Sequence, residues 1–567
     1  MNLSLDRRLA AVLVPVFAFR GQHDLGIGDI AALREFIDWA ARSGFGVVKI
    51  LPINETGGDH SPYNAISSRA LEPTTIDTQP GELPDLRQAD FDEVLAASAL
   101  PSSPDLEHVD YPRVKALKRR LLEKAFERFN HGAYRRATGR GLAFRQFLET
   151  EGSWLQHYAL FRVLMGHYAG SEMWDRWSPE HRTPQEAEHW LGTLPKRRSE
   201  ELRKRMRYFC YVQWIAFEQW RNVKAHANQA GIALMGDIPF GVSFYSADVW
   251  ANPTQFQGQW CGGTPPDTTF KHDAFVQKWG QNWGIPLYDW KVMQADGFRW
   301  WRDRVHGVRE FFDLFRIDHI LGFYRIYAFP WRPDRNPEFL PLTVEQARER
   351  LNGETPRFHP HPDDTDKHKA ANRESGELLL RAIIEEAGPG RLVGEDLGEV
   401  PDYVRPSLAS LGIAGYKIPY WEMQADGRLV EGRKYERLSL AMYGTHDHAP
   451  LKAMWESLAA ASQGADGLPA RAEMQRLGAF AGIAPDALPL EYTRDLHTAL
   501  LRALFASNSW IAAVMITDLF ARTERFNLPG VGAGNWTRRL HLPVAQLDSD
   551  ESLPPLREMI AASQRLP

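Results

Sequence analysis

The chain has 567 residues and a mass of 64.6 kDa, and its 67 basic and 72 acidic residues give a formal charge of −5. This balance argues against a strongly basic nucleic-acid-binding protein and against an acidic tail protein. Two cysteines, Cys210 and Cys261, are too few for a disulfide scaffold or a four-thiolate zinc site. No apolar run approaches the ~18 residues that cross a bilayer, so we expect neither a membrane nor a nucleic acid as partner.

The first apolar run follows Arg7 and Arg8 and resembles either a secretion signal or a buried strand. Pro15 interrupts the run, and polar residues 20–24 follow it without the small residues of a cleavage site. A strand that is covered on both faces explains residues 11–17 better, because such strands are continuously apolar. We therefore expect a first strand here and a cytoplasmic protein.

The chain then alternates between helix and strand patterns. Residues 29–42 have apolar side chains at helical spacing, with Asp29 as the N-cap, and residues 46–51 form a second strand. This β-α-β order predicts a parallel sheet. Later strands are expected at residues 232–235, 311–317, 391–394, 413–418, 440–443 and 511–516. Together they predict an α/β fold, a (β/α)8 TIM barrel with helical insertions.

Two segments depart from this rhythm. Residues 80–210 contain charged, helix-forming stretches and few β-branched runs, which predicts a mainly helical insertion. Residues 332–375 are rich in Pro, His and Asp, which predicts a loop insertion. The expected organisation is therefore the first β/α units over 1–79, the insertion over 80–210, and the rest of the barrel over 211–567.

Five potential metal ligands lie in the 332–375 segment: His359, His361, Asp363, Asp364 and His368. Their spacing fits no metal-ligand pattern on a regular element, so we expect a solvated loop and no metal.

The 19 tryptophans are a weak indication of carbohydrate binding, because aromatic faces stack on sugar rings as well as filling cores. For Trp174 and Trp177, core packing is the favoured interpretation over a secondary glucan site.

Three acidic residues directly follow predicted strands: Asp318, Glu395 and Asp447. In a barrel these strand ends meet at the C-terminal face, where barrel enzymes carry out their chemistry, although each residue could instead cap a helix or pair with an arginine. We expect Arg316 to keep Asp318 ionised, since a nearby positive charge lowers a carboxyl pKa. A second carboxyl in a more apolar pocket keeps its proton for longer, and such a split pair is what glycosyl transfer requires.

Short motifs in a fixed order accompany these carboxylates. They include Gly26-Ile27-Gly28-Asp29, Ser61-Pro62-Tyr63, Gly236-Asp237-Ile238-Pro239, Pro265-Pro266-Asp267, Gly280-Gln281-Asn282-Trp283-Gly284 and Gly534-Asn535-Trp536. From about Val14 to Trp536, their order and spacing resemble the amylomaltase or disproportionating-enzyme family of 4-α-glucanotransferases, glycoside hydrolase family 77.

The resemblance implies transfer of α-1,4-glucan segments or glucosyl units between glucans by a retaining double displacement. Asp318 would be the nucleophile, Glu395 the general acid/base, and Asp447 the carboxylate that holds the sugar's 2- and 3-hydroxyls. The implied substrate-binding residues are Tyr63, Ser61, Asp237, Arg316, His446, Gln281, Trp283 and Asp267. The implied partners are maltooligosaccharides and glycogen or starch-like glucans, with no metal or organic cofactor.

One departure from the family pattern keeps alternatives open. Thr268 and Thr269, with Phe270 next, stand where the family often has aromatic residues directly after Pro-Pro-Asp. A mainly hydrolytic α-glucosidase or amylase-like enzyme is therefore one alternative, and a non-catalytic glucan-binding protein is another. The intact trio of carboxylates argues against the second alternative, since a binding protein has no use for an acid and a nucleophile.

Overall fold

The computed structural model describes residues 3–98, 107–268, 273–464, 467–531 and 534–567. Eight parallel strands form the centre of the molecule. In order around the ring they are β1 (Leu9–Leu13), β2 (Val47–Lys49), β3 (Ala233–Ile238), β6 (Leu314–Ile317), β9 (Leu392–Gly394), β10 (Gly415–Lys417), β11 (Ser439–Ala441) and β12 (Ile511–Met515). Strand β1 pairs with both β2 and β12, and a bridge between Val393 and Ala414 joins β9 to β10. The predicted (β/α)8 barrel is therefore confirmed.

Each of the eight predicted strand segments overlaps one observed strand. The largest displacement is in the first, which pairs with β12 from Leu9 onwards and ends at Leu13. Pro15 has no N–H to donate to a strand ladder, and the chain continues into a short 3-10 helix over Val16–Ala18. Every barrel strand except β10 is completely buried, which explains why most of them are continuously apolar in the sequence.

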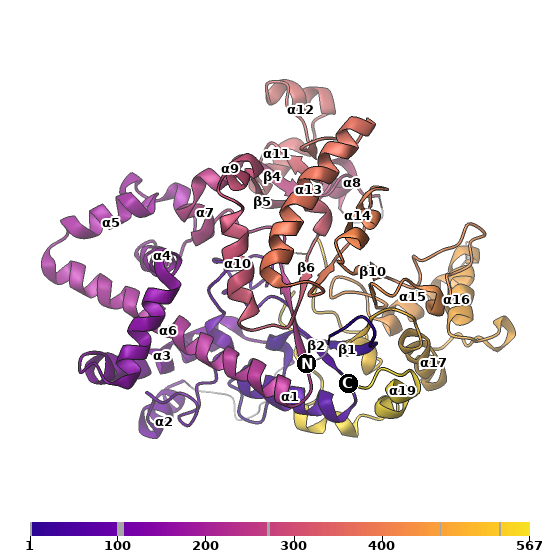
Figure 1. Cartoon of the computed structure of the whole chain (residues 1–567), viewed down its shortest axis with the longest axis horizontal. Helices are drawn as coiled ribbons and strands as arrows, with labels where there is room; N and C mark the ends of the chain where they lie inside the picture. The colour runs from indigo at the N-terminus through magenta and orange to yellow at the C-terminus, as the bar shows by residue number, and fades with distance from the viewer. Residues whose placement is uncertain (1–2, 99–106, 269–272, 465–466, 532–533) are drawn as a thin grey trace.

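Helices lie around the outside of the barrel (Figure 1). They are α1 (Ile30–Arg42), α7 (Ala247–Ala251), α9 (Trp290–Ala295), α10 (Arg299–Arg309), α13 (Asp366–Ala387), α14 (Val404–Ser410), α15 (Leu451–Ser462), α16 (Leu468–Phe480), α17 (Arg494–Phe505), α18 (Ile516–Leu519) and α19 (Leu556–Ala562). Three further helices lie away from the barrel strands and contribute to a second, smaller core: α8 (Ala274–Trp279), α11 (Asn336–Phe339) and α12 (Val344–Arg350). The chain ends lie together beneath the barrel, where Arg8 donates a 2.8 Å hydrogen bond to the Ser563 carbonyl.

A group of long helices lies to one side of the barrel, in violet in Figure 1. They are α2 (Gln88–Ala96), α3 (Tyr111–Phe129), α4 (Gly139–His167), α5 (Pro184–Thr193) and α6 (Lys196–Gln229). Helix α6 runs without a break past residue 210, packs against α1 and leads into β3. The division of the chain at residue 210 stays a prediction. Helix α6 contains this residue, so the expected boundary falls inside one continuous helix.

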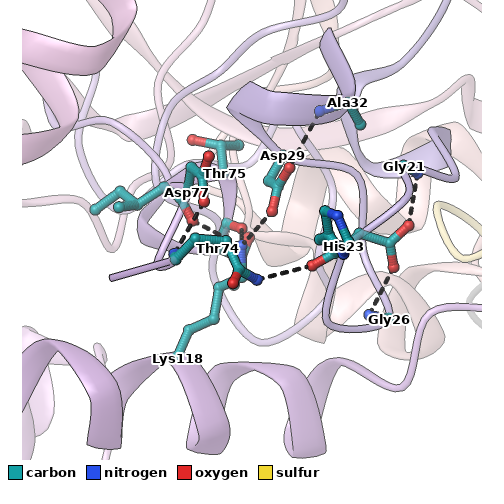
Figure 2. A network of polar contacts seen from close by, with 12 residues as sticks. Gly21, His23, Gly26, Asp29, Ala32, Thr74, Thr75, Asp77 and Lys118 are labelled. Carbon is teal, nitrogen blue, oxygen red and sulfur yellow. Dashed lines mark hydrogen bonds and ion pairs between the residues drawn. The ribbon is translucent and has the colours of Figure 1, made fainter. Parts of the chain in front are cut away.

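A buried lysine fastens α3 to the barrel (Figure 2). The Lys118 side chain is 1% exposed, and its Nζ lies 3.2 Å from Oδ2 of Asp29. The same Nζ donates to the carbonyls of Thr74 and Ile76, at 2.7 Å each. Asp29 also caps α1 by accepting the Ala32 N–H, as the sequence predicts. One ammonium therefore ties together the insertion, the first barrel helix and the loop after β2.

A four-stranded antiparallel sheet lies apart from the barrel and was not predicted. Its strands, in the order β5-β4-β7-β8, are β5 (Asn282–Tyr288), β4 (Phe256–Gly263), β7 (Ile326–Phe329) and β8 (Arg357–His359). Strand β4 contains three glycines and has register shifts against β5, so it lacks the alternation that identifies a strand in a sequence. A second small core of Trp279, Phe329, Trp331, Phe339 and Ala347 supports this sheet.

The segment 332–375 is more ordered than a solvated loop. Asp363 is 7% exposed and pairs with Arg325 at 3.0 Å, and His359 packs on Trp260 with ring centroids 4.2 Å apart. Between residues 3 and 567, and outside the four internal gaps, no three His, Cys, Asp or Glu residues are placed to hold a metal ion.

The two tryptophans that the sequence assigned to packing do pack. Trp177 is 2% exposed and stacks on Tyr168, and Trp174 stacks on Phe244. No helix in the described part of the chain is both long enough and apolar enough to cross a membrane.

Candidate active site

The site residues follow the carboxyl ends of five barrel strands. Arg316 lies on β6 and Asp318 directly follows it, Glu395 follows β9, and Asp237 lies near the end of β3. Tyr63 lies on the loop after β2, and His446 and Asp447 lie on the loop after β11. Because parallel strands of a barrel end at one face, residues far apart in the sequence meet there.

Arg316 is the centre of this group, which we call the carboxyl cluster: Asp237, Asp318, Glu395, Asp447 and Arg316. The guanidinium is completely buried. Its Nη1 donates to both oxygens of Asp237 at 2.7 Å, and its Nη2 lies 2.9 Å from Asp318 and 3.1 Å from Glu395. One guanidinium group therefore contacts three carboxyl groups.

The two carboxyl groups at Nη2 reach solvent. The side chains of Asp318 and Glu395 are 26% and 17% exposed, whereas Arg316 and Asp237 are not exposed at all. The second oxygen of Glu395 accepts the backbone N–H of His319 at 2.8 Å. His319 has a left-handed backbone with φ of 40°, a conformation that non-glycine residues rarely adopt. The backbone N–H of His319, the residue that follows Asp318, therefore holds the Glu395 carboxyl group in place.

The charge balance around Asp318 differs from the sequence expectation. Burial raises the pKa of the Asp318 carboxyl well above its ordinary value, and the charges of Glu395, Asp237 and Asp447 act in the same direction against Arg316. The expected contact with Arg316 exists, but the guanidinium is shared with Asp237 and Glu395. Asp318 therefore retains a proton more readily than an isolated aspartate.

Asp447 has the opposite electrostatic environment. Burial acts to raise the pKa of its carboxyl, but the His446 imidazole, the Asn527 amide and Arg316 hold that pKa below its usual range. His446 Nε2 lies 3.1 Å from one oxygen of Asp447, and Asn527 donates to the other at 2.5 Å. Asp447, which is 38% exposed, is thus an ionised carboxylate at neutral pH.

An aromatic wall stands beside the carboxyl cluster. Tyr63 and His446 stack with ring centroids 4.9 Å apart, and Trp536 lies 6.0 Å from Tyr63. The Tyr63 hydroxyl donates to Asp237 at 2.9 Å and accepts from Arg316 at 3.3 Å. These bonds fix the orientation of the ring, so that it offers a preformed apolar surface.

The remaining predicted substrate-binding residues lie further from the cluster. Trp283 on β5 is 37% exposed, meets the His319 ring edge-on at 4.9 Å, and donates to the side chain of Gln281 at 3.2 Å. Ser61 accepts the Tyr63 N–H at 3.3 Å. The Asp267 N–H donates to the Val276 carbonyl at 3.3 Å on the loop between β4 and α8. Thr269 and Phe270, on which the hydrolytic alternative depends, lie outside the described residues.

Two residues of the site had no role in the sequence prediction. Asn527 contacts Asp447, and Lys49 at the end of β2 lies 3.8 Å from Asp237. Asn527 lies in a motif, Asn527-x-Pro529-Gly530, that carried no assigned role. The sequence could have indicated Lys49, because it is a lysine inside an apolar strand. A buried lysine almost always has a charged partner.

The arrangement is suited to cleaving and remaking a glycosidic bond. Two carboxyl oxygens that contact the same nitrogen, at 2.9 and 3.1 Å, are at most about 6 Å apart, less than the ~6.5–9.5 Å of inverting glycosidases. Such a pair can act as nucleophile and acid, and the ionised Asp447 can accept sugar hydroxyls.

Comparison with known proteins agrees with this geometry. The family model of glycoside hydrolase family 77, described as 4-alpha-glucanotransferase, matches residues 14–545. A 4-alpha-glucanotransferase of Chlamydia muridarum is 28% identical over 565 residues, which cover 96% of this chain and 93% of that protein. The 4-alpha-glucanotransferase DPE2 of Oryza sativa subsp. japonica is 34% identical over 331 residues, which cover 57% of this chain and 32% of that protein.

Solved structures show the same fold. The amylomaltase of Streptococcus agalactiae in complex with acarbose has a TM-score of 0.77 at 24% identity, over 99% of this chain and all of that one. The amylomaltase of Corynebacterium glutamicum has a TM-score of 0.72 at 20% identity, over 99% of this chain and 76% of that one. With a family model matched over most of its length, the chain belongs to glycoside hydrolase family 77, the 4-alpha-glucanotransferases.

Proposed function

We propose that this 4-alpha-glucanotransferase acts by a retaining double displacement on maltooligosaccharides and longer glucans such as glycogen or starch. The observation that carries the proposal is the shared contact of Asp318 and Glu395 with Nη2 of Arg316, because it holds two solvent-facing carboxyl groups closer together than the pair of an inverting glycosidase.

In the first step, the Asp318 carboxylate attacks the anomeric carbon of the sugar that stacks on Tyr63. The bond to the departing glucan oxygen breaks as Glu395 donates its proton to that oxygen. A covalent glycosyl-aspartate remains. Arg316 stabilises the negative charge of Asp318 before attack and of Glu395 after proton transfer.

In the second step, the 4-hydroxyl of an acceptor glucan replaces the leaving chain. Glu395 takes the proton of that hydroxyl, its oxygen attacks the anomeric carbon, and Asp318 is released with the original configuration restored. Asp447 accepts hydroxyls of the donor sugar in both steps, which holds the ring as it distorts. The products are two glucans with the same total number of glucose units.

The reaction balances without a metal ion or an organic cofactor, because each proton that leaves Glu395 returns to it. We also propose a cytoplasmic location. Its support is the sequence interpretation of the first apolar run as a buried strand and not as a secretion signal.

Two variants with an activated donor test the assigned roles. An α-maltosyl fluoride donor needs no protonation of its leaving group, so Glu395→Gln is expected to release fluoride in the first turnover at a rate near that of the wild type. Later turnovers should be slow, because Glu395 is also the base of the second step. Asp318→Asn is expected to release it at least ~10³-fold more slowly, since no nucleophile remains. Equal and large losses in both variants would contradict the division of roles, and an inverted product would contradict the double displacement.

A further inference from the structure

Lys49 is a buried cation that the proposed mechanism does not use. It is the last residue of β2, its side chain is not exposed, and its Nζ lies 3.8 Å from Oδ2 of Asp237. Nζ has no hydrogen-bond partner among the residues that the structure describes. A buried ammonium without hydrogen bonds is costly, so its place beside the site calls for a reason other than packing.

The contacts of Asp237 supply such a reason. Both oxygens of Asp237 contact Nη1 of Arg316 at 2.7 Å, while Oδ2 also faces Nζ of Lys49 and accepts from Tyr63. Among the described residues, Asp237 pairs with Lys49 and Arg316, whereas Asp318 and Glu395 pair with Arg316. With Lys49, a second charge neutralises part of Asp237, and more of the Arg316 potential acts on the two carboxyl groups that face solvent.

We propose that Lys49 is a positioning residue of the transfer reaction, whose charge acts through Asp237 and Arg316 to keep the Asp318 carboxylate ionised. This inference rests on the proposed function. It concerns how the charge of the site depends on pH, and Lys49 itself touches neither substrate nor the reacting atoms.

The surroundings of Lys49 also make its charge adjustable. Burial lowers the pKa of Lys49 to about 8, although Asp237 acts to raise it. Arg316 lowers the Lys49 pKa further, and Glu395 and Asp318 raise it. Above this pH the cluster loses one positive charge, so Asp318 binds a proton more tightly.

Three variants separate this role from a structural one. Lys49→Met removes the charge at every pH, Lys49→Arg keeps it at every pH, and Lys118→Met removes the other buried ammonium, which pairs with Asp29. The measurement is kcat/KM for maltotriose between about pH 4 and 10, with the melting temperature as a record of folding.

The acid limb of the pH profile is expected to separate the two Lys49 variants. In Lys49→Met the acid limb moves up by about 0.5 to 1 pH unit, because Asp318 loses a stabilising charge. In Lys49→Arg the acid limb stays in place, because arginine keeps the positive charge beside Asp237. Lys118→Met lowers the melting temperature and leaves both limbs in place. A Lys49→Met enzyme that is slower at every pH, with unmoved limbs, would overturn the inference.

A second measurement does not depend on turnover. In protein labelled with ¹³C at the lysine ε-carbon, the resonance that is lost in Lys49→Met is expected to titrate near pH 8, and its midpoint to fall in Asp237→Asn. A midpoint that is unchanged in Asp237→Asn would overturn the coupling on which the inference rests. If the wild type makes no longer glucans from maltotriose, the proposed function fails, and this titration still decides whether Lys49 and Asp237 are coupled.

Discussion

Nη1 of Arg316 lies 2.7 Å from both carboxylate oxygens of Asp237, and neither side chain is exposed. Breaking a buried ion pair of this kind is strongly unfavourable, because removal of one partner leaves an uncompensated buried charge. Such a loss typically lowers the free energy of unfolding by ~3–5 kcal/mol. The pair fixes the guanidinium plane and thereby aims Nη2 at Asp318 and Glu395.

Arg316→Lys is therefore expected to lose activity although it keeps the charge. A lysine ammonium is a point charge that cannot contact Asp237 through one nitrogen and the Asp318–Glu395 pair through another. We expect kcat/KM for maltotriose to fall by ~10²-fold or more, with a lower melting temperature. Arg302→Lys, at the exposed pair with Glu385, is the control and should change neither value. Wild-type kinetics in Arg316→Lys would show that the fork geometry is dispensable.

The acid side of the activity profile is expected to report Asp318 and not Asp447. The pKa of Asp318 is raised by burial and like charges, so activity falls as Asp318 takes up a proton, starting above the ~3.9 of an ordinary aspartate. Asp447 stays ionised across this range because its pKa is lowered. Asn527→Ala should raise KM while leaving the acid limb of kcat/KM in place. Full wild-type activity below about pH 3.5 would contradict this assignment.

Asp518, next to β12, is expected to control how stability depends on pH. It is 2% exposed, accepts the Leu451 N–H at 2.6 Å, and burial raises its pKa to about 7. Since the unfolded chain gives up this proton at about pH 4, the free energy of unfolding falls as pH rises from about 4 to 7, by up to about 4 kcal/mol. Asp518→Asn keeps the acceptor for Leu451 and should flatten this part of the stability curve, as measured by urea unfolding. An equally steep curve in the variant would assign the effect to other groups.

Trp283 is expected to contribute to glucan binding more than to folding. Its side chain is 37% exposed and stands beside His319, the neighbour of Asp318. Trp283→Ala should raise KM for maltooligosaccharides by about tenfold, the order of one lost aromatic contact, with little change in melting temperature. Trp177→Ala is the contrasting variant, because that ring is buried and its loss should destabilise the fold. A large loss of stability in Trp283→Ala would assign the ring to the core.

The barrel could be predicted because its strands are covered on both faces. Segments such as β1 and β12 are continuously apolar, and their β/α rhythm permits few other folds. The antiparallel sheet could not be predicted in the same way. Its longest strand, β4, has glycines and register shifts, and its place depends on a separate core around Trp331 that forms only in three dimensions.

Part of the candidate site could also be predicted from the barrel pattern. Asp318, Glu395 and Asp447 each follow a strand, and strand ends of a barrel converge. The contacts of Arg316 with three carboxyl groups could not be predicted from the sequence. Only Asp318 is close to Arg316 in the chain, and the other two partners come from distant strands. Asp237 comes from β3 and Glu395 from β9, so the charge balance that raises the Asp318 pKa follows from packing alone.

Maltotriose alone, incubated with the purified protein and resolved by chain length over time, tests the central claim most directly. A transferase that works by double displacement is expected to release glucose and, at the same time, a ladder of glucans longer than maltotriose, with the number of reducing ends unchanged. Glucose and maltose without longer products, and a rising number of reducing ends, would show hydrolysis and would contradict the account.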